Sequence, residues 1–406
     1  MFPPINEQMD VIREGISEIL PEDELVRKLE YSAKKNIPLN VKLGADPSRP
    51  DLHLGHAVVL RKMRQFQDLG HQAILIIGDF TGMIGDPTGR SKTRPALTLE
   101  ETRGNGQSYF EQATKILSGK RMKMLYNSEW LSRMSFVDVV YLASKYTVAR
   151  MLERDDFDQR YKAGESIGIH EFLYPLAQAM DSVAVHSDIE LGGTDQKFNL
   201  LVAREIQREY GLDPQSIVLM PILEGTGGRE KMSKSLDNYI AITDTPNEMY
   251  GKTMSIPDTL IERYFALGLF APPSEIERVK KFLAEGGNPR DAKRELARGL
   301  VALYAGEEAA VSAEKAFEEL FVKKEIPEDI PEWTPEQQAD EYSLTAILTE
   351  SKLVESGGEA RRMIQQGGVS VNGEKISEIN YRVALRDPVV IKVGKRKFIR
   401  VVPRLN

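Results

Sequence analysis

The chain has 406 residues, which exceeds one typical domain and predicts two or three domains. Hydrophobic residues make up 41% and charged residues 28% of the chain, as in globular proteins, and the lack of cysteine excludes disulfide bonds, thiolate metal sites and a cysteine nucleophile. The net charge of −7 argues against a surface that binds nucleic acid throughout, and the longest apolar run, Ala73–Ile77, is too short to span a membrane.

The first half of the chain alternates strand patterns with helix patterns. Apolar residues at helical spacing predict a helix over Leu54–Leu69, and the continuous apolar run Ala73–Ile77 predicts a strand buried on both faces. Similar patterns predict three further strands and a second helix, namely Asn40–Ala45, Asp188–Leu191, Ile217–Met220 and Asp195–Tyr210. This alternation indicates an α/β fold with a doubly wound, parallel, Rossmann-like sheet.

The patterns along the chain also predict its domain boundaries. We expect the α/β domain over residues 1–245, with a mainly helical insertion at about 105–180, and an α-helical domain over 246–324. Residues 325–340 contain three prolines among acidic residues, which indicates a linker. Residues 341–406 have a mixed pattern, which predicts a small α+β domain.

Charge is distributed unevenly between these regions. Residues 341–406 hold 12 Lys or Arg against 7 Asp or Glu, whereas the rest of the chain carries a net charge of −12. A basic module on an acidic body suggests a local contact with a polyanion. On charge alone, a solvated basic surface is an equally good interpretation.

A His-x-Gly-His sequence, His53-Leu54-Gly55-His56, lies at the start of the first predicted helix. Unpaired backbone N–H groups at a helix start favour anions, imidazoles can donate hydrogen bonds to phosphate or ribose oxygens, and Gly55 leaves room for a nucleotide base. A metal site is a weaker interpretation because no third ligand is evident nearby. Taken alone, the two histidines are as well explained as ordinary surface residues.

A second motif, Lys231-Met232-Ser233-Lys234-Ser235, follows about 175 residues later. The preceding glycines, Gly225, Gly227 and Gly228, suggest a mobile loop that can close over a ligand. Two ammonium groups suit the charge that develops on a departing pyrophosphate. An exposed basic turn is the alternative for the lysine motif by itself.

Together, the two motifs resemble the HIGH and KMSKS signatures of class I aminoacyl-tRNA synthetases, and nearly the whole chain resembles the bacterial tyrosyl-tRNA synthetases. Three further segments match that family in order: Gly82–Arg90, the spacing Tyr174-x-x-x-Gln178-x-x-Asp181, and Gly192–Gln196. Five ordered matches are far more specific than any one of them. Gly82–Gly89 lacks the Gly-Lys-Ser/Thr ending of a P-loop.

The resemblance implies roles for individual residues. It places the catalytic contacts at His53, His56, Lys231, Lys234 and Ser48. The ATP-binding residues that it implies are Pro47, Ser48, His53, Gly55, His56, Gly193, Asp195, Lys231, Met232, Ser233, Lys234 and Ser235. The tyrosine-binding residues that it implies are Asp46, Thr81, Asp86, Tyr174, Gln178, Asp181 and Gln196. Arg90 and Arg94 are further candidates for the pyrophosphate, with ordinary surface charge as the alternative.

The spacing of Tyr174, Gln178 and Asp181 agrees with this assignment, because residues at i, i+4 and i+7 share one helix face. A buried polar stripe between helices would have the same spacing. A buried carboxylate such as Asp181 suits a phenol OH, and phenylalanine would leave it unpaired. The resemblance assigns the substrate ammonium to Asp86, Tyr174 and Gln178.

One position departs from the family pattern. Well-known tyrosyl enzymes carry a tyrosine two residues before the glycine of the first strand, where it contacts the phenol, but this chain has Lys42-Leu43-Gly44. We interpret the change as variation within a bacterial subgroup. It leaves Asp181 as the surer partner of the phenol.

The last region resembles an S-four-type RNA-binding domain, named after a ribosomal protein. A short helix carries Arg361 and Arg362, and Asn372-Gly373 predicts a hairpin turn. Phosphate contacts are expected from these arginines and from basic residues of the final strands, namely Lys395, Arg396 and Lys397, together with Lys392 and Arg400. A basic β-hairpin without a partner is the alternative.

The resemblance implies a cytoplasmic enzyme that activates L-tyrosine with ATP and transfers it to the 3′ end of tRNA(Tyr). It also implies a homodimer, Mg²⁺ that accompanies ATP, no metal held by the protein alone and no membrane partner; Met1–Asp10 shows no signal-peptide pattern. Two rivals are a tryptophanyl-type synthetase, which shares the ATP motifs, and a non-enzymatic RNA-binding protein on the same scaffold. The Tyr-Gln-Asp spacing argues against the first rival, and the intact histidine and lysine motifs argue against the second.

Overall fold

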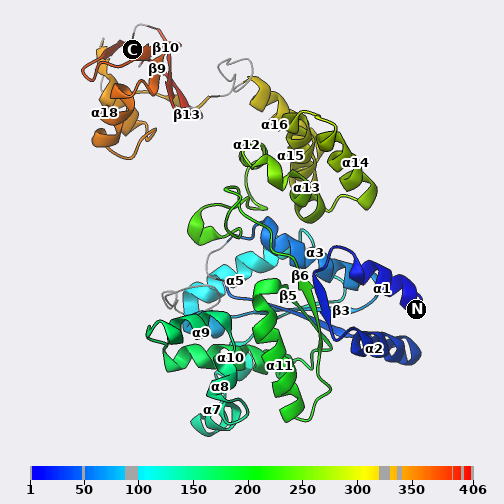
Figure 1. The fold of residues 1–406 in the computed structure, drawn as a ribbon. Coiled ribbons are helices and arrows are strands. Elements are labelled where there is room, and N and C mark those ends of the chain that lie inside the picture. The colour runs from blue at the N-terminus through cyan, green and yellow to red at the C-terminus, as the bar shows by residue number, and fades with distance from the viewer. Residues whose placement is uncertain are drawn as a thin grey trace. The chain divides into compact units, whose positions relative to one another are not determined.

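The computed structural model of the chain describes residues 2–47, 51–86, 99–319, 330–335, 341–385, 387–394 and 397–403. The chain forms two compact units, Met1–Phe317 and Glu318–Asn406 (Figure 1). Within the described ranges, no helix is both long enough and apolar enough to cross a membrane.

The first unit is built on a six-stranded sheet in the order β1-β6-β5-β2-β3-β4. Strands β2 to β6 run parallel to one another, and β1 pairs antiparallel with β6 at one edge. The strands are β1 (Glu18–Leu20), β2 (Asn40–Ala45), β3 (Gln72–Ile77), β4 (Met122–Tyr126), β5 (Ile189–Gly193) and β6 (Ser216–Met220). The chain builds outward from β2 to β3 and β4 on one side and from β5 to β6 on the other, so the strand order reverses between β2 and β5.

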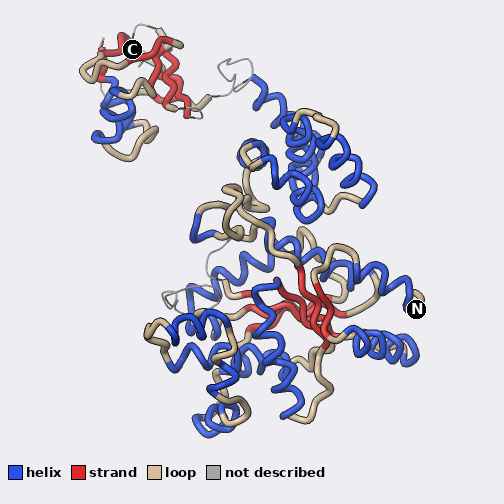
Figure 2. The backbone as a smooth tube through the Cα atoms, in the orientation of Figure 1, coloured by secondary structure: helices blue, strands red, loops and turns tan. Residues whose placement is uncertain are grey.

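Helices cover both faces of this sheet (Figure 2). Those of the α/β part are α1 (Ile5–Arg13), α2 (Glu22–Lys35), α3 (Leu54–Asp68), α4 (Thr81–Ile84), α5 (Leu99–Ala113), α6 (Ser128–Leu131), α7 (Phe136–Ala143), α8 (Val148–Met151), α9 (Asp155–Lys162), α10 (Ile169–Ala184) and α11 (Lys197–Glu209), with the short 3₁₀ turns η1 (Thr194–Gln196) and η2 (Lys234–Leu236). The predicted strands and both predicted helices are confirmed within a few residues at each end. The doubly wound α/β fold expected from the sequence is therefore present.

Two strands of the first unit were not predicted from the sequence. Met122–Tyr126 lies inside the region expected to be mainly helical, yet it forms the edge strand β4 beside β3. Its lysine and methionine residues have high helix propensity and give no clear strand alternation, so tertiary pairing decides its structure. The three-residue strand β1 is too short to show any periodicity.

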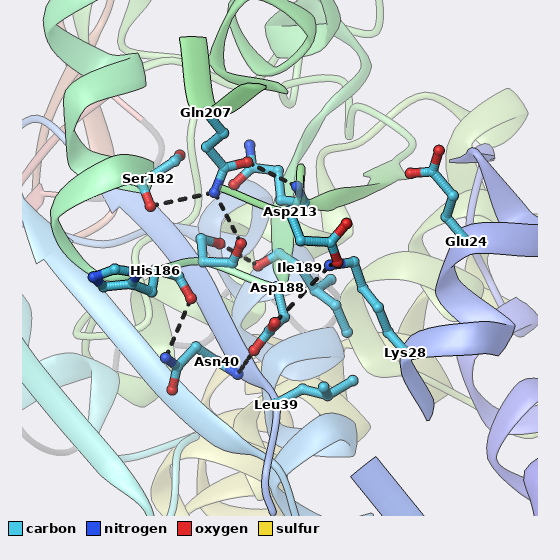
Figure 3. Close-up of polar contacts among 12 residues, drawn as sticks. Glu24, Lys28, Leu39, Asn40, Ser182, His186, Asp188, Ile189, Gln207 and Asp213 are labelled. Carbon is cyan, nitrogen blue, oxygen red and sulfur yellow. Dashed lines mark hydrogen bonds and ion pairs between the residues drawn. The ribbon is translucent and has the colours of Figure 1, made fainter. Parts of the chain in front are cut away.

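Polar contacts fix β2 and β5 at their N-terminal ends (Figure 3). The carboxylate of Asp188 accepts a hydrogen bond from the backbone N–H of Asn40 at 2.8 Å, and the side chain of Asn40 donates to the carbonyl of Val185 at 3.1 Å. The buried ammonium of Lys28 pairs with Asp213 and lies 4.0 Å from Asp188. These contacts lie at the strand ends opposite those that bear the candidate site.

The rest of the first unit is helical, as expected. Its helices are α12 (Pro246–Met254), η3 (Asp258–Leu260), α13 (Ile261–Tyr264), the π-helical turn η4 (Phe265–Leu269), α14 (Pro273–Ala284), α15 (Pro289–Ala305) and α16 (Glu307–Phe317). Buried side chains of α12, α13 and α15 share one continuous apolar core with α3 and the sheet, which explains why the expected boundary at residue 245 falls inside a single compact unit.

The second unit has its own apolar core and two small sheets. Its elements are β7 (Glu332–Trp333), β8 (Glu341–Ser343), α17 (Leu344–Glu350), α18 (Gly357–Gln365), β9 (Val369–Val371), β10 (Glu374–Ile376), β11 (Arg382–Ala384), β12 (Val389–Val393) and β13 (Lys397–Val401). The larger sheet has the order β10-β9-β12-β13-β7, and β11 pairs with β8. Strand β7 lies within the segment expected to be a linker, because Glu332 and Trp333 pair with β13.

Candidate active site

A cavity of about 300 Å³ opens at the carboxyl ends of β2 and β5, where the strand order reverses. This is the expected ligand position in a doubly wound sheet, and the volume suits a small-molecule site. Most of the residues predicted from the sequence line it: Asp46, His53, Gly55, His56, Thr81, Asp86, Tyr174, Gln178, Asp181, Gly193, Asp195, Gln196, Lys231, Met232, Ser233 and Lys234. Pro47 lies beside the cavity and accepts a hydrogen bond from Asn105 at 2.9 Å.

Several predicted residues lie outside the described part of the chain. They are Ser48, Arg90, Arg94, Lys395, Arg396 and the side chain of Ser235. Their assignments stay predictions from the sequence.

Asp46, directly after β2, joins two of the predicted residues. One carboxylate oxygen accepts a hydrogen bond from the Tyr174 hydroxyl at 2.8 Å, and the other accepts one from the Thr81 hydroxyl at 2.7 Å. A Cβ on Gly78 would lie 1.9 Å from Asp46 Oδ1, so this close approach requires glycine. Burial, followed by the charge of Asp46, raises the pKa of Tyr174 well above its usual value and keeps the hydroxyl protonated as a donor.

Asp181 is a buried carboxylate on α10 at the inner part of the cavity wall. It accepts a hydrogen bond from the indole N–H of Trp130 at 2.9 Å and from the side-chain amide of Asn127 at 3.3 Å. Burial raises the pKa of Asp181 to about 7, and the nearby charge of Lys42 opposes this shift. The amide of Asn127 also donates to Thr81 at 2.9 Å, so the Asp46 and Asp181 clusters are connected.

Asn127 and Trp130 were missed because β4, which places them, was not predicted. Polar side chains at the carboxyl end of a parallel strand are candidates for a site. Had Met122–Tyr126 been recognised as a strand, this rule would have identified both residues.

Asp86 lies at another part of the wall and is held by two side chains. Gln196 donates to one of its oxygens at 3.0 Å, and the buried Arg154 lies 3.4 Å from the other. Arg154 also donates to Asn199 at 3.2 Å, and Asn199 donates to Gln196 at 3.1 Å. Arg154 comes from the helical insertion and carries no recognisable sequence signal for this role.

The paired histidines lie at the N-terminus of α3. Their ring centroids are 3.9 Å apart, and the backbone N–H of His53 donates to Nδ1 of His56 at 3.3 Å, which leaves Nε2 of His56 as its donor. Burial, helped by the charge of Lys234, lowers the pKa of His53 to about 3. His53 is therefore an uncharged imidazole at neutral pH and adds no positive charge to the site.

The backbone next to these histidines is fixed by two strand-like contacts. The N–H of Leu54 donates to the carbonyl of Ile240 at 3.0 Å, and the N–H of Ile242 donates to the carbonyl of Leu52 at 3.0 Å, as in an antiparallel β-bridge. A Cβ on Gly55 would lie 3.1 Å from the His53 ring. Any larger residue at position 55 would press on that imidazole.

Residues of the lysine motif line the same cavity. Lys231 pairs with Asp195 at 2.6 Å, and the buried Lys234 donates a short hydrogen bond to the hydroxyl of Tyr109. The backbone N–H of Met232 donates to Leu223 at 2.9 Å, which ties the loop to the end of the sheet. A ribose bound by Asp195 would compete with the Lys231–Asp195 pair. Tyr109, on α5, is a further site residue that the sequence did not reveal.

Lys42 occupies the sequence position where the family carries a phenol-binding tyrosine, but its side chain does not line the cavity. Its side chain is fully buried beneath α10, where the ammonium lies 2.8 Å from Glu190 and donates to the Ser182 hydroxyl at 2.8 Å. A buried ion pair with Glu190 thus stands where the familiar tyrosine would contact the phenol. The donors that reach Asp181 are Trp130 and Asn127 instead.

The second unit presents the predicted arginines on its surface. Arg361 and Arg362 are exposed on α18, and Asn372 and Gly373 both have positive φ in the tight turn between β9 and β10, as the hairpin prediction required. Lys397 is exposed at the start of β13 and donates to the carbonyl of Leu353 at 2.7 Å.

The described residues contain no group of three or more His, Cys, Asp or Glu side chains placed to hold a metal ion.

Two family models together match nearly all of the chain. The model described as tRNA synthetases class I (W and Y) matches residues 34–322, and the model described as Tyrosine--tRNA ligase SYY-like C-terminal domain matches residues 322–401.

Curated relatives match along their full length. A Tyrosine--tRNA ligase of Salinibacter ruber is 56% identical over 408 residues, which covers 100% of this chain and 98% of the relative. That of Chlorobaculum tepidum is 56% identical, and the match covers 99% of this chain and 98% of the relative. That of Thermotoga maritima is 53% identical, and the match covers 97% of each chain. Among solved structures, the tyrosyl-tRNA synthetase of Archaeoglobus fulgidus, complexed with L-tyrosine, has a TM-score of 0.62 at 24% identity and covers 77% of this chain and 100% of its own, which supports the fold.

The surroundings of Asp181 predict a titration that tryptophan fluorescence can follow. The emission of Trp130 should change with a midpoint near pH 7, because its indole N–H donates to a carboxylate whose pKa burial raises to about 7. Trp333→Phe removes the other tryptophan of the chain and isolates the signal. The transition should disappear in Asp181→Asn; its persistence in that variant would assign it to another group.

Proposed function

The chain belongs to the Tyrosine--tRNA ligases of the class I tRNA synthetase family, and we propose that the cavity at the β2–β5 switch point is where its tyrosine and ATP react. The enzyme activates L-tyrosine with ATP to tyrosyl-adenylate and pyrophosphate, and then transfers tyrosine to the 3′ end of tRNA(Tyr). The observation that carries the assignment of the site is that all the predicted tyrosine residues and most of the predicted ATP residues line one cavity.

Asp181 is the proposed partner of the substrate phenol. It is buried at the cavity wall, and two donors, Trp130 and Asn127, already fix its carboxylate. A phenol OH would donate to this group, whereas phenylalanine would leave it without that bond, a rule for which tyrosyl enzymes are themselves the standard example. The ionised form of Asp181 is the better acceptor, so tyrosine binding should weaken as the pH falls below about 7.

Asp86, Tyr174 and Gln178 are the proposed partners of the substrate ammonium. Asp46 holds the hydroxyl of Tyr174 and is itself held by Thr81, and Gln196 holds Asp86. Fixed polar groups at both ends of the amino acid would orient its carboxylate toward ATP. Such positioning is a large part of catalysis in a reaction that joins two bound substrates.

The ATP side of the site is proposed to consist of the two motif segments and the loop after β5. His56 and the neutral His53 would donate hydrogen bonds to phosphate and ribose oxygens, Gly193 and Asp195 would hold the ribose, and Lys231 and Lys234 would supply positive charge to the pyrophosphate. Pro47, Ser48, Gly55, Met232, Ser233 and Ser235 complete the predicted ATP contacts.

Neither chemical step requires a nucleophile from the protein. The tyrosine carboxylate attacks the α-phosphorus of ATP, the bond to pyrophosphate breaks, and the terminal ribose hydroxyl of tRNA later attacks the tyrosyl carbonyl and releases AMP. We expect Mg²⁺ to enter with ATP as a ligand of its phosphates. The residues of this chain contribute alignment and charge stabilisation.

The second unit is the proposed contact for tRNA(Tyr). Its exposed arginines, Arg361 and Arg362, lie on one short helix, α18, and the exposed Lys397 adds a further cation. Phosphate contacts of this kind supply affinity and position the RNA. A cytoplasmic location belongs to this proposal, because tRNA and ATP are available there.

A homodimer is supported by an exposed apolar face on the helical insertion. Phe136, Val137, Val140 and Tyr141 occupy one side of α7 with 51–83% of each side chain exposed, and Ile169 at the start of α10 is 80% exposed. Large contiguous apolar patches on a protein surface commonly mark interfaces. We propose that a second copy of the chain covers this face, as the family resemblance implies.

Amino-acid-dependent ATP–pyrophosphate exchange tests the activity. Exchange should occur with tyrosine and stay far lower with tryptophan and phenylalanine; exchange with none of the three would overturn the enzyme assignment, and exchange with tryptophan alone would overturn the tyrosine assignment. Lys234→Ala should lower kcat about 10²–10³-fold, as expected for loss of a group that stabilises the charge of the transition state. The exposed Lys162→Ala should match the wild type.

Charging of tRNA tests the second unit. Arg361→Ala combined with Arg362→Ala should leave tyrosine-dependent exchange intact and lower kcat/KM for tRNA about 10-fold, with a shallower dependence on salt because fewer phosphates are contacted. Arg382→Ala is the matched control, since Arg382 is an exposed arginine of the same unit that pairs with Glu341. Unchanged charging in the double variant would refute the role of α18.

Light scattering after size exclusion tests the dimer. The wild type should have twice the 45.7 kDa mass of one chain, and Phe136→Glu combined with Val140→Glu should shift it toward the monomer, because two carboxylates would be buried at the interface. Val311→Glu, at a half-exposed position on α16, should stay dimeric. A monomeric wild type, or a double variant that stays dimeric, would contradict the proposed interface.

A further inference from the structure

Lys42 and Glu190 form an ion pair directly beneath the proposed tyrosine site. The two residues lie opposite each other in the register of β2 and β5, the strands that flank the switch point. Their side chains are 0% and 1% exposed, and the distance from the ammonium to the carboxylate is 2.8 Å. Nothing in the resemblance or in the proposed reaction uses this pair.

The pair is costly to bury, and stability does not explain its presence. Removing two charges from water costs several kcal/mol for each ion, and apolar side chains of similar size are often at least as stable in such places. Buried ion pairs that persist need a full set of partners. Lys42 has them, because it also donates to the Ser182 hydroxyl at 2.8 Å and to the backbone carbonyl of Gln178 at 3.3 Å.

Both carboxylate oxygens of Glu190 have hydrogen-bond donors near them. Its Oε2 accepts from the Ser182 hydroxyl at 3.0 Å and from the amide of Gln215, and its Oε1 accepts from Lys42. The side-chain amide nitrogen of Gln178 lies 3.5 Å from the same Oε1. The opposite rotamer of Gln178 would turn its amide oxygen toward this carboxylate, where the two acceptors would repel each other.

The orientation of Gln178 therefore follows from the charge of Glu190. With its nitrogen toward Glu190, its amide oxygen is buried and has no hydrogen-bond partner among the residues that the structure describes. Gln178 lines the cavity, so this oxygen is the group that remains for a ligand. An unpaired buried acceptor is unfavourable until a donor arrives.

We propose that the Lys42–Glu190 pair is a positioning element for amino-acid recognition, which turns the amide oxygen of Gln178 toward the cavity to accept a hydrogen bond from the substrate ammonium. The proposal rests on the proposed function, since it takes tyrosine as the ligand of this cavity. Lys42 neutralises Glu190 and holds the backbone of Gln178, and Glu190 sets the direction of the amide. Glu190 itself lines the cavity wall, and the pair acts on the substrate ammonium through the amide of Gln178.

Two variants separate this role from general support of the fold. Lys42→Met combined with Glu190→Met removes both charges together, and so avoids leaving one of them unpaired in the interior. Glu190→Gln retains the size of the side chain but has one acceptor oxygen for several donors, and its new N–H groups would attract the amide oxygen of Gln178 away from the cavity. Thermal unfolding of each variant shows whether it is folded.

The measurement is competitive inhibition of tyrosine-dependent ATP–pyrophosphate exchange by two analogues. Tyrosinol retains the ammonium and lacks the carboxylate, whereas 3-(4-hydroxyphenyl)propionate retains the carboxylate and lacks the ammonium. In both variants the inhibition constant of tyrosinol should rise about 10–100-fold, as expected for loss of a hydrogen bond to a charged group. That of the propionate, and the KM for ATP, should stay within about twofold.

Lys28→Met is the matched control. Lys28 is another buried lysine, paired with Asp213 at the opposite ends of the same strands, so this variant should affect neither analogue (Figure 3). Equal weakening of both analogues, or no change in tyrosinol binding, would overturn the proposal. If the double variant does not fold, Glu190→Gln decides the question. Failure of the proposed function would be distinguishable, because the wild type would then show no tyrosine-dependent exchange.

Discussion

The reversal of strand order between β2 and β5 is the constraint on which the rest of the first unit depends. At that point the chain leaves neighbouring parallel strands in opposite directions, so no connection crosses their shared carboxyl ends. The cavity lies in the space that is left, and the loops after β2 and β5 carry Asp46 and Asp195 to its rim. The helices α3 and α10, which follow or precede these strands, supply the histidine pair and the Tyr174–Gln178–Asp181 face.

Burial then determines the charge states within this cavity. It raises the pKa of Asp181 to about 7 and lowers that of His53 to about 3, so a carboxylate near its titration point and a neutral imidazole lie in one site. Two lysines line the cavity, and each has an internal partner: Lys231 pairs with Asp195, and Lys234 with Tyr109. In the proposed function, substrate atoms would replace these internal partners. Such an exchange limits the cost of desolvation when a charged substrate enters.

The fold was largely predictable wherever a segment carries its own pattern. The continuous apolar run of β3 and the helical spacing of α3 reflect burial on two faces and on one face, and both were identified within a few residues. Strand β4 was not, because Met122–Tyr126 has little strand pattern and is held as an edge strand by pairing with β3. That single omission also hid Asn127 and Trp130, which β4 places beside Asp181.

The sequence by itself determined the family, because its motifs reside in short segments with fixed spacing, and it predicted which residues bind ATP and tyrosine. Only the tertiary structure decided which groups these residues meet. Lys42 and Glu190 lie almost 150 residues apart in the chain and become neighbours through the pairing of β2 with β5, and Arg154 reaches Asp86 from the helical insertion. The energy of a buried charge depends on all the groups around it, and those groups come from distant segments that no local pattern relates.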